Sequence, residues 1–339
     1  MKPTDFAYYL SDYLSKYLPG TAGLSMNTIM SYRDTFSLLL LFCNTKKKLP
    51  PEKITLSHLN KELVEEYLSW LESDRRCSTS TRNVRLAAIH AFYRYLQLEF
   101  PYYLYQAQQI LALPVKRTKK NTIEYLSLDA MQILLRMPEQ TTKEGRRDRV
   151  ILSLLYDSAA RVQELADTKV CDVRIQSPST IKLTGKGDKS RIVPLMQPMA
   201  VLLEQYLIEN EFTSHHTSSY PLFCNRSKDK LTRAGIAYIV TKYTDIARGL
   251  SPGLFPDKLS PHCFRHSKSM HLLQSGVNLV YIRDFLGHVD IQTTEVYARI
   301  DGEMKRKALE KSSSNILSEK LPAWQSNPGL MSWLKNLGK

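Results

Sequence analysis

The sequence predicts a mainly α-helical fold with a small β-sheet, an α+β arrangement of two domains. Its 339 residues are too many for one typical domain and too few for three. Apolar residues recur at helical spacing in most segments. Only around residues 181–195 do two β-rich runs flank a Gly-rich turn, which is typical of a β-hairpin.

The composition is that of an ordinary soluble globular protein, with 43% hydrophobic and 24% charged residues. The net charge of +14 is less ordinary, and it favours a polyanionic partner, either nucleic acid or an anionic membrane surface. A basic protein without such a partner is the alternative.

The sequence contains no feature that directs the chain into a membrane or an oxidising compartment. No stretch approaches the roughly 20 apolar residues of a membrane span, and residues 1–10 lack the pattern of a signal peptide. The five cysteines are scattered without a Cys-x-x-Cys spacing, which argues against a disulfide framework and a structural zinc. We therefore expect a cytoplasmic, nucleoid-associated protein with no membrane partner.

Residues 1–115 are predicted to form a helical bundle. Helices are expected over 25–43 and 58–72 and from about residue 80 onward, where apolar residues keep helical spacing. Arg82 and Arg85 are expected on either a solvated basic face or a face that enters a DNA groove. They lie opposite the apolar stripe of the third helix, which comprises Val84, Ala88, Ala91, Phe92 and Tyr95.

Residues 116–122 are predicted to be a basic linker. The stretch 114–122, Pro-Val-Lys-Arg-Thr-Lys-Lys-Asn-Thr, is polar, basic and without apolar periodicity. Such a segment can also follow the backbone of DNA.

A second domain is predicted over 123–311, followed by a tail over 312–339. It begins with a helix capped by Ser127, and an apolar helix over 149–159 precedes the hairpin. Lys242, in the helix of 232–248, is a further candidate for contact with nucleic acid. Other helices are expected near 198–209, 260–275, 278–286 and 290–299. The tail has a Ser-rich hinge and then a short amphipathic pattern of Leu330, Trp333, Leu334 and Leu337.

The segment Ser260-Pro261-His262-Cys263-Phe264-Arg265-His266 carries the first candidate side chains. Ser260 and Pro261 predict a helix start, with the serine as the cap. His262 and Arg265 then lie three residues apart on one face, and His266 is expected to pack or to support them. Alone, such a pair is more often a surface coincidence than a site.

The segment Leu286-Gly287-His288 supplies the next candidates. Gly287 suits the left-handed residue that ends a helix, and it fixes the direction of His288. Asp290 can cap the following helix, in which Tyr297 stands nine residues after His288. A single tyrosine at such a place usually belongs to a core.

Arg161, Glu164 and Lys186 complete the candidates. Arg161 and Glu164 follow the apolar helix of 149–159, where a simple ion pair between them is the alternative to a functional role. Lys186 lies between two glycines on the hairpin turn, where a solvated lysine is the ordinary case. We reject a nucleotide phosphate loop, because the Walker pattern is absent and the turn joins two strands.

Taken together, these segments resemble the tyrosine recombinases, also called phage-integrase-type recombinases. The order and spacing agree with that family: 25 residues from Arg161 to Lys186, 76 to His262, 23 from Arg265 to His288 and 9 to Tyr297. The resemblance is strong over 125–300 and rests on pattern alone over 5–115. Its motifs are Ala-Arg-Val-Gln-Glu-Leu at 160–165, Gly-Lys-Gly-Asp-Lys-Ser-Arg-Ile-Val-Pro-Leu at 185–195, His-Cys-Phe-Arg-His at 262–266, Leu-Gly-His at 286–288 and Thr-Thr-Glu-Val-Tyr at 293–297.

These residues suit the cleavage of a phosphodiester without a cofactor. Arg161 and Arg265 are permanent cations whose planar groups can neutralise the phosphorane. Tyr297 would be the nucleophile, and His262 is expected to take or share its proton.

Three supporting roles complete the predicted site. The resemblance implies that Lys186 protonates the leaving 5′ oxygen. His288 is expected to donate a hydrogen bond to the phosphate, and Glu164 to orient Arg161.

The resemblance further implies a C-shaped clamp on double-stranded DNA, a tetrameric synapse of identical chains and, in some members, an accessory or partner recombinase. We favour a mobile-element recombinase or transposase for integration and excision. A chromosome- or plasmid-dimer resolvase and a type IB topoisomerase use the same site and are the nearest alternatives. A non-catalytic DNA-binding protein, or a basic membrane- or RNA-binding protein, leaves the spacing unexplained. The helix of the tail can dock on a neighbouring subunit or on its own chain.

Overall fold

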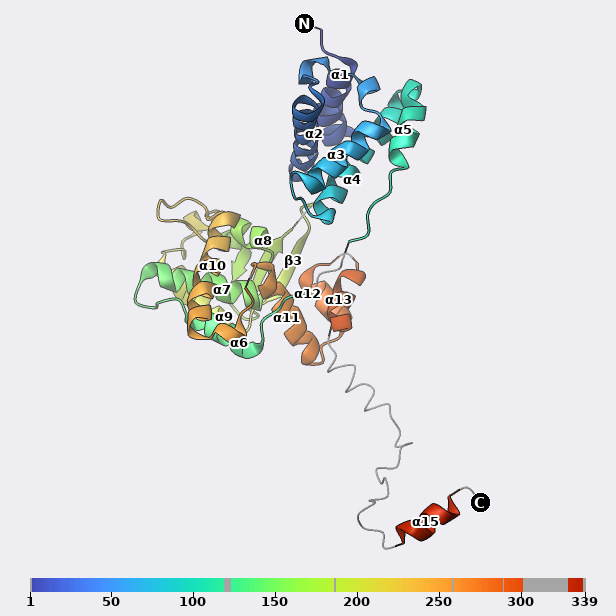
Figure 1. Cartoon of the computed structure of the whole chain (residues 1–339). Coiled ribbons are helices and arrows are strands. Elements are labelled where there is room, and N and C mark those ends of the chain that lie inside the picture. The colour runs from blue at the N-terminus through green and yellow to red at the C-terminus, as the bar shows by residue number, and fades with distance from the viewer. Residues whose placement is uncertain are drawn as a thin grey trace. The chain divides into compact units, whose positions relative to one another are not determined.

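The computed structural model describes residues 2–118, 123–185, 187–257, 259–288, 290–300 and 329–337. The chain divides into two units, Met1–Asn121 and Thr122–Lys339. Both are mainly helical, as predicted (Figure 1). Among the described residues, no helix is both long enough and apolar enough to span a membrane.

The first unit is a helical bundle (Figure 1). Its three predicted helices are present as α2, α3 and α4, and the side chains of Asn60 and Ser78 cap α3 and α4. We did not predict α1, the π-helix η1, α5 or the short 3-10 helices η2, η3 and η4. The elements are α1 Asp5–Asp12, η1 Tyr13–Thr21, α2 Met26–Lys47, η2 Pro51–Lys53, η3 Leu56–His58, α3 Lys61–Ser73, α4 Thr79–Glu99, η4 Pro101–Tyr103 and α5 Leu104–Leu111.

The buried face of α4 differs from the predicted one at Val84 and Arg82. Val84 is 49% exposed, whereas Leu86, Ile89 and Phe92 are buried in the core of the bundle. Arg82, which we placed on the opposite face, is only 7% exposed. The rest of the predicted stripe is confirmed, because Ala88, Phe92 and Tyr95 are buried. Val84 alone lies outside the face that meets the other helices.

The second unit combines helices with one antiparallel sheet of three strands in the order β1-β2-β3. The predicted hairpin is present, with Ile181 opposite Val193 and Leu183 opposite Arg191. Strand β1 has only two residues, too few for a sequence pattern. The elements are α6 Leu128–Arg136, α7 Lys143–Asp157, α8 Val162–Asp167, η5 Val170–Asp172, β1 Val173–Arg174, β2 Thr180–Thr184, β3 Ser190–Pro194, α9 Gln197–Glu209, η6 His215–Thr217, α10 Arg233–Leu250, η7 Pro252–Leu254, α11 His262–Gln274, α12 Leu279–Leu286, α13 Gln292–Ile300 and α15 Leu330–Asn336.

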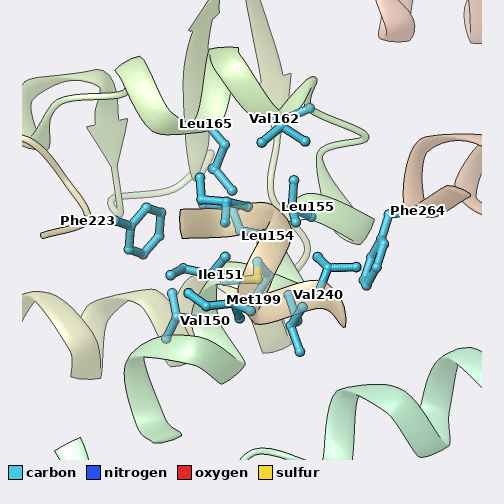
Figure 2. Close-up of a cluster of buried hydrophobic side chains, with 14 of the residues drawn as sticks. Val150, Ile151, Leu154, Leu155, Val162, Leu165, Met199, Phe223, Val240 and Phe264 are labelled. Carbon is cyan, nitrogen blue, oxygen red and sulfur yellow. The ribbon is translucent and has the colours of Figure 1, made fainter. Parts of the chain in front are cut away.

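Helix α7 contributes several side chains to the main apolar core of the second unit (Figure 2). Its Ile151, Leu154 and Leu155 are fully buried in one cluster with side chains of α8 and α11, among them Leu165 and Phe264. This apolar packing fixes the positions of α8, which follows Arg161, and of α11, which contains Arg265.

Two helix starts differ from the prediction. Helix α7 begins at Lys143, earlier than predicted, because the Thr142 side chain caps its charged first turn. Helix α11 begins at His262 with Pro261 as the cap residue. We expected the Ser260 hydroxyl to cap the helix. It does not do so, and it lies 3.8 Å from the Cys263 Sγ atom. Pro261 displaces the cap by one residue, because its ring fixes the backbone in a helical conformation.

A second, smaller cluster joins α11, α12 and α13. Met270 and Leu273 of α11, Ile282 and Leu286 of α12, and Tyr297 of α13 are all buried in it. The predicted hinge near residue 312 lies outside the described residues. The amphipathic segment of the tail contains the helix α15, and its Trp333 and Leu334 are exposed, as is Leu337 directly after it.

Candidate active site

Glu164 is a buried carboxylate that binds Arg161 in two ways. The Arg161 backbone N–H donates to Glu164 Oε2 at 2.9 Å, and Arg161 Nη1 donates to Oε1 at 2.6 Å. Glu164 is 3% exposed, whereas the Arg161 side chain is 39% exposed. The predicted ion pair is therefore present, and it leaves part of the Arg161 guanidinium open to a ligand.

Arg191 of β3 is a second partner of Glu164 that we did not predict. Arg191 Nη2 donates to Glu164 Oε2 at 2.8 Å, and Arg191 Nε donates to the Phe285 carbonyl oxygen at 3.1 Å. Burial raises the pKa of Glu164, but the hydrogen bonds and charges of Arg191 and Arg161 outweigh it and lower the pKa to about 2. The strand alternation places Arg191 on the same face as the buried Val193, and this signal could have revealed it.

Arg265 of α11 is 4% exposed and joins two of the predicted segments. Its Nη1 donates to the Ala159 carbonyl oxygen at 2.8 Å, and its Nη2 donates to the Leu286 carbonyl oxygen at 2.6 Å. Burial and the charges of Arg161 and Arg191 lower its pKa to about 9, so it is a cation at neutral pH.

Gly287 ends α12 in the left-handed conformation, with a φ of 65°, as predicted, and His288 follows it directly. The Nδ1 atom of His288 lies 3.0 Å from the Thr294 hydroxyl oxygen. Burial, then the charges of Arg265 and Arg161, lower the pKa of His288 to about 4. The ring is therefore neutral at pH 7, and Thr294 fixes its orientation.

Tyr297 is 3% exposed, and its hydroxyl oxygen lies 2.9 Å from Nδ1 of His266. Burial raises the pKa of Tyr297, whereas the Ser269 hydroxyl and the charges of Arg265 and Arg161 oppose this rise. Burial and the neighbouring His262 and Arg265 lower the pKa of His266 to about 4, so this ring is a neutral acceptor at pH 7.

His262 does not have the position that we predicted for it. It is the exposed first residue of α11, and its ring centroid lies 6.5 Å from that of His266. The place beside the Tyr297 hydroxyl belongs to His266, because that residue lies one turn further into α11, where α13 packs against it.

Lys186 lies outside the described residues, but the start of its turn is well placed. A Cβ atom at Gly185 would lie 2.8 Å from Glu164 Oε1 and 3.7 Å from Arg161 Nη1. Gly187 has a φ of 75°, which favours glycine. The glycine that precedes Lys186 therefore touches the Arg161–Glu164 pair.

The predicted DNA contacts of the first unit are engaged within the chain. Arg82 Nη1 donates to the Pro114 carbonyl oxygen at 3.1 Å, and Arg85 Nη1 donates to the Ser31 carbonyl oxygen at 3.0 Å. The prediction of an exposed basic face is therefore wrong for Arg82, because its guanidinium binds the chain just before the linker. Lys242 of α10 is exposed, with its ammonium 4.7 Å from the centre of the Tyr243 ring.

Throughout the described ranges, no group of three or more His, Cys, Asp or Glu could hold a metal ion. The arrangement instead offers two cations, Arg161 and Arg265, beside two neutral histidines and a tyrosine hydroxyl. Such a set can neutralise an anionic ester and move a proton from the tyrosine.

Comparison with known proteins identifies the family. Residues 124–304 match the Phage integrase family, and residues 11–99 match the Phage integrase, N-terminal SAM-like domain. The chain therefore belongs to the phage integrase family. The family includes the tyrosine recombinases, and this chain therefore belongs to the enzyme class of the site-specific DNA recombinases.

Relatives of this chain are similar to it in sequence over most of its length. It is 31% identical over 336 residues to the "Putative integrase/recombinase y4rC" of Sinorhizobium fredii (strain NBRC 101917 / NGR234), covering 99% of both chains. It is 31% identical over 292 residues to tyrosine recombinase XerC of Syntrophus aciditrophicus (strain SB), covering 84% of this chain and 91% of that one. The structure of XerH site-specific recombinase bound to its palindromic difH substrate has the same fold, with a TM-score of 0.65, 22% identity, and coverage of 89% of this chain and 85% of that one.

Proposed function

We propose that this chain cleaves and rejoins double-stranded DNA at specific sites through a covalent 3′-phosphotyrosyl link at Tyr297. The observation that carries the proposal is the position of Arg265. This buried guanidinium binds the Ala159 carbonyl, two residues before Arg161, and the Leu286 carbonyl, two residues before His288. Three separate motifs thereby meet at one cation.

Charge neutralisation comes from the two arginines. The scissile phosphate is an anion, and it gains charge as the nucleophile attacks. Arg161 and Arg265 place two positive charges beside its oxygens, and each guanidinium has further N–H groups besides those that donate to Glu164, Ala159 and Leu286. Single preorganised donors of this type contribute roughly 3–4 kcal/mol in other enzymes. His288, oriented by Thr294, donates a further hydrogen bond to the phosphate.

Proton transfer completes the reaction. The Tyr297 hydroxyl passes its proton to Nδ1 of His266 while its oxygen forms a bond to phosphorus. The bond from phosphorus to the 5′ oxygen breaks, and Lys186 gives that oxygen a proton. Strand joining is the reverse of these steps, so it needs no ATP. Because Tyr297 is 3% exposed, its hydroxyl reaches the phosphate only after α13 shifts on DNA.

A suicide substrate tests the assignment. The substrate is a duplex with a nick close to the cleavage point, so that a short fragment diffuses away and the covalent complex accumulates. The wild-type chain is expected to form an adduct that survives denaturation. Tyr297→Phe is expected to form none while it binds the same DNA with nearly the same Kd. An adduct that persists in this variant contradicts the assignment.

Strand exchange distinguishes a recombinase from a type IB topoisomerase, which performs the same cleavage. A plasmid with two copies of the target site is expected to be resolved into two circles, and a plasmid with no copy is expected to stay supercoiled. Relaxation of both plasmids at equal rates, without exchange, favours the topoisomerase.

We further propose that the chain acts on a mobile element, by integration, excision or transposition. The relative that covers 99% of both chains is described as an integrase/recombinase and supports this role. The XerC relative supports the alternative, a dimer resolvase. Sequencing of the DNA trapped on Tyr297 in cells separates the two. The ends of a mobile element support the first, and a single chromosomal or plasmid site supports the second.

Assembly is part of the proposal. We expect a clamp formed by residues 1–115 and 123–311, joined by the linker of 116–122, and a tetramer of this chain on DNA, with or without a partner recombinase. Deletion of residues 312–339 is expected to leave the binding of a single chain unchanged and to weaken cooperative binding to paired sites. Trp333→Ala in α15, where the side chain is 39% exposed, is the matched point variant. Unchanged assembly in both variants contradicts a docking role for the tail.

A further inference from the structure

We propose that Arg191 is a positioning residue for the cleavage step, and that it acts through Glu164 on Arg161 and through Gly287 on His288. The inference rests on the proposed cleavage at Tyr297. Arg191 belongs to β3, outside the six residues that were predicted to perform the chemistry.

The Arg191 side chain connects three segments of the site. Its guanidinium donates to Glu164 and to the Phe285 carbonyl, and its side chain is 13% exposed. The stem lies on Gly287, where a Cβ atom would be 2.9 Å from Arg191 Cδ. This glycine leads directly to His288. One side chain therefore holds the end of α12 against the strand that follows the Lys186 turn.

The division of the Glu164 carboxylate explains how Arg191 acts on Arg161. Oxygen Oε1 accepts from the Arg161 side chain, and Oε2 accepts from Arg191 and from the Arg161 backbone. Without Arg191, the buried Oε2 lacks its cation, and the Arg161 guanidinium is drawn to satisfy both oxygens. The N–H groups of Arg161 would then turn away from the phosphate.

The same carboxylate supports the Lys186 turn. Gly185 lies against Oε1, and its backbone N–H donates to the Lys189 carbonyl oxygen at 2.9 Å, which continues the β2–β3 ladder. Arg191 is opposite Leu183 in that ladder. The bond from Arg191 to Glu164 therefore anchors the β2–β3 hairpin to α8.

The geometry requires arginine in particular. Two donors of one planar group, Nη2 and Nε, reach a carboxylate and a backbone carbonyl on different helices. A lysine retains the charge with a single nitrogen. Arg191→Lys is therefore expected to lie between the wild type and Arg191→Met.

The test compares single-turnover cleavage of two suicide duplexes that carry the trapped target sequence. One has an ordinary scissile phosphate, and the other has a methylphosphonate there, which removes the charge that Arg161 neutralises. On the ordinary duplex, Arg191→Met is expected to be 10- to 100-fold slower, on the order of losses from removing a supporting partner. Its Kd for DNA should change little. Its melting temperature should fall, because the buried Glu164 loses a cation, so the rates are compared at a temperature where both proteins are folded. On the methylphosphonate duplex, Arg191→Met should cleave only a few-fold more slowly than the wild type.

The control is Arg226→Met, which removes an arginine from an ion pair with Glu144 at an exposed place, where the Arg226 side chain is 86% exposed. It should cleave both duplexes at the wild-type rate. An equal loss by Arg191→Met on both duplexes shows a merely structural role and overturns the proposal.

A double-mutant cycle tests the route through Glu164. If Arg191 acts through this carboxylate, Glu164→Gln combined with Arg191→Met loses no more activity than the slower single variant. Losses that multiply overturn the route. A wild-type chain that forms no adduct on the ordinary duplex refutes the proposed function itself. Wild-type adducts with full activity of Arg191→Met refute only the role of Arg191.

Discussion

The lowered pKa of Glu164 makes the stability of the second unit depend on pH in a defined window. Its pKa falls from 4.5 to about 2, and at 1.36 kcal/mol per pKa unit this corresponds to roughly 3 kcal/mol. Because the folded pKa is below the unfolded one, the stabilisation is complete above pH 4.5 and is lost as the pH falls toward 2. Glutamine resembles the protonated carboxyl, so Glu164→Gln should be less stable by about this amount at pH 7.

Differential scanning calorimetry of the full chain measures this effect. The transition of the second unit should shift down in Glu164→Gln at pH 7, and the shift should shrink steadily between pH 4.5 and 2. The first unit contains none of these residues and serves as the internal reference. Glu144→Gln, at the exposed pair with Arg226, should shift the transition little. A difference between the wild type and Glu164→Gln that is the same at pH 3 and pH 7 refutes the reasoning.

The remaining predictions concern the reacting groups and their support. Lys186→Ala should cleave an ordinary duplex poorly but recover on a duplex with a 5′-bridging sulfur, because a thiolate leaves without a proton; no recovery argues against an acid role. His266→Phe retains a ring but removes the acceptor for Tyr297, so adduct formation should slow by about 10²- to 10⁴-fold with DNA binding retained. Adduct formation at the wild-type rate in His266→Phe would show that another group accepts the Tyr297 proton. Gly287→Ala should destabilise the chain by about 1–2 kcal/mol, since its φ is 65° and its Cβ would press on Arg191. Urea unfolding measures this, and a stability equal to that of the wild type contradicts the close approach.

Local signals predicted the parts of the fold that local interactions determine. Ser127 caps its helix through a backbone N–H group three residues away, and Gly287 ends α12 with its own backbone. The hairpin follows from two short β-rich runs and its turn. Each of these depends on neighbours within a few residues, so the sequence contains the necessary information.

The missed features depend on contacts between distant residues. Arg82 turns inward because the Pro114 carbonyl, 32 residues away, accepts from it. His266 meets Tyr297 over 31 residues, and Arg191 meets Glu164 over 27. The packing of α11 on α13, and of β2 on α8, decides which of several similar side chains is placed in the site. No spacing within one segment distinguishes His262 from His266 in this respect.

The most direct test of the account is the chemical identity of the adduct. The wild-type chain is trapped on a suicide duplex labelled at the 5′ end of the cleaved strand, then digested with trypsin and nuclease and analysed by mass spectrometry. We predict that the peptide of residues 284–299 carries a nucleotide joined through its 3′ phosphate to Tyr297, and that the labelled strand stays with the protein. A modification on any other residue, or a link through a 5′ phosphate, contradicts the account.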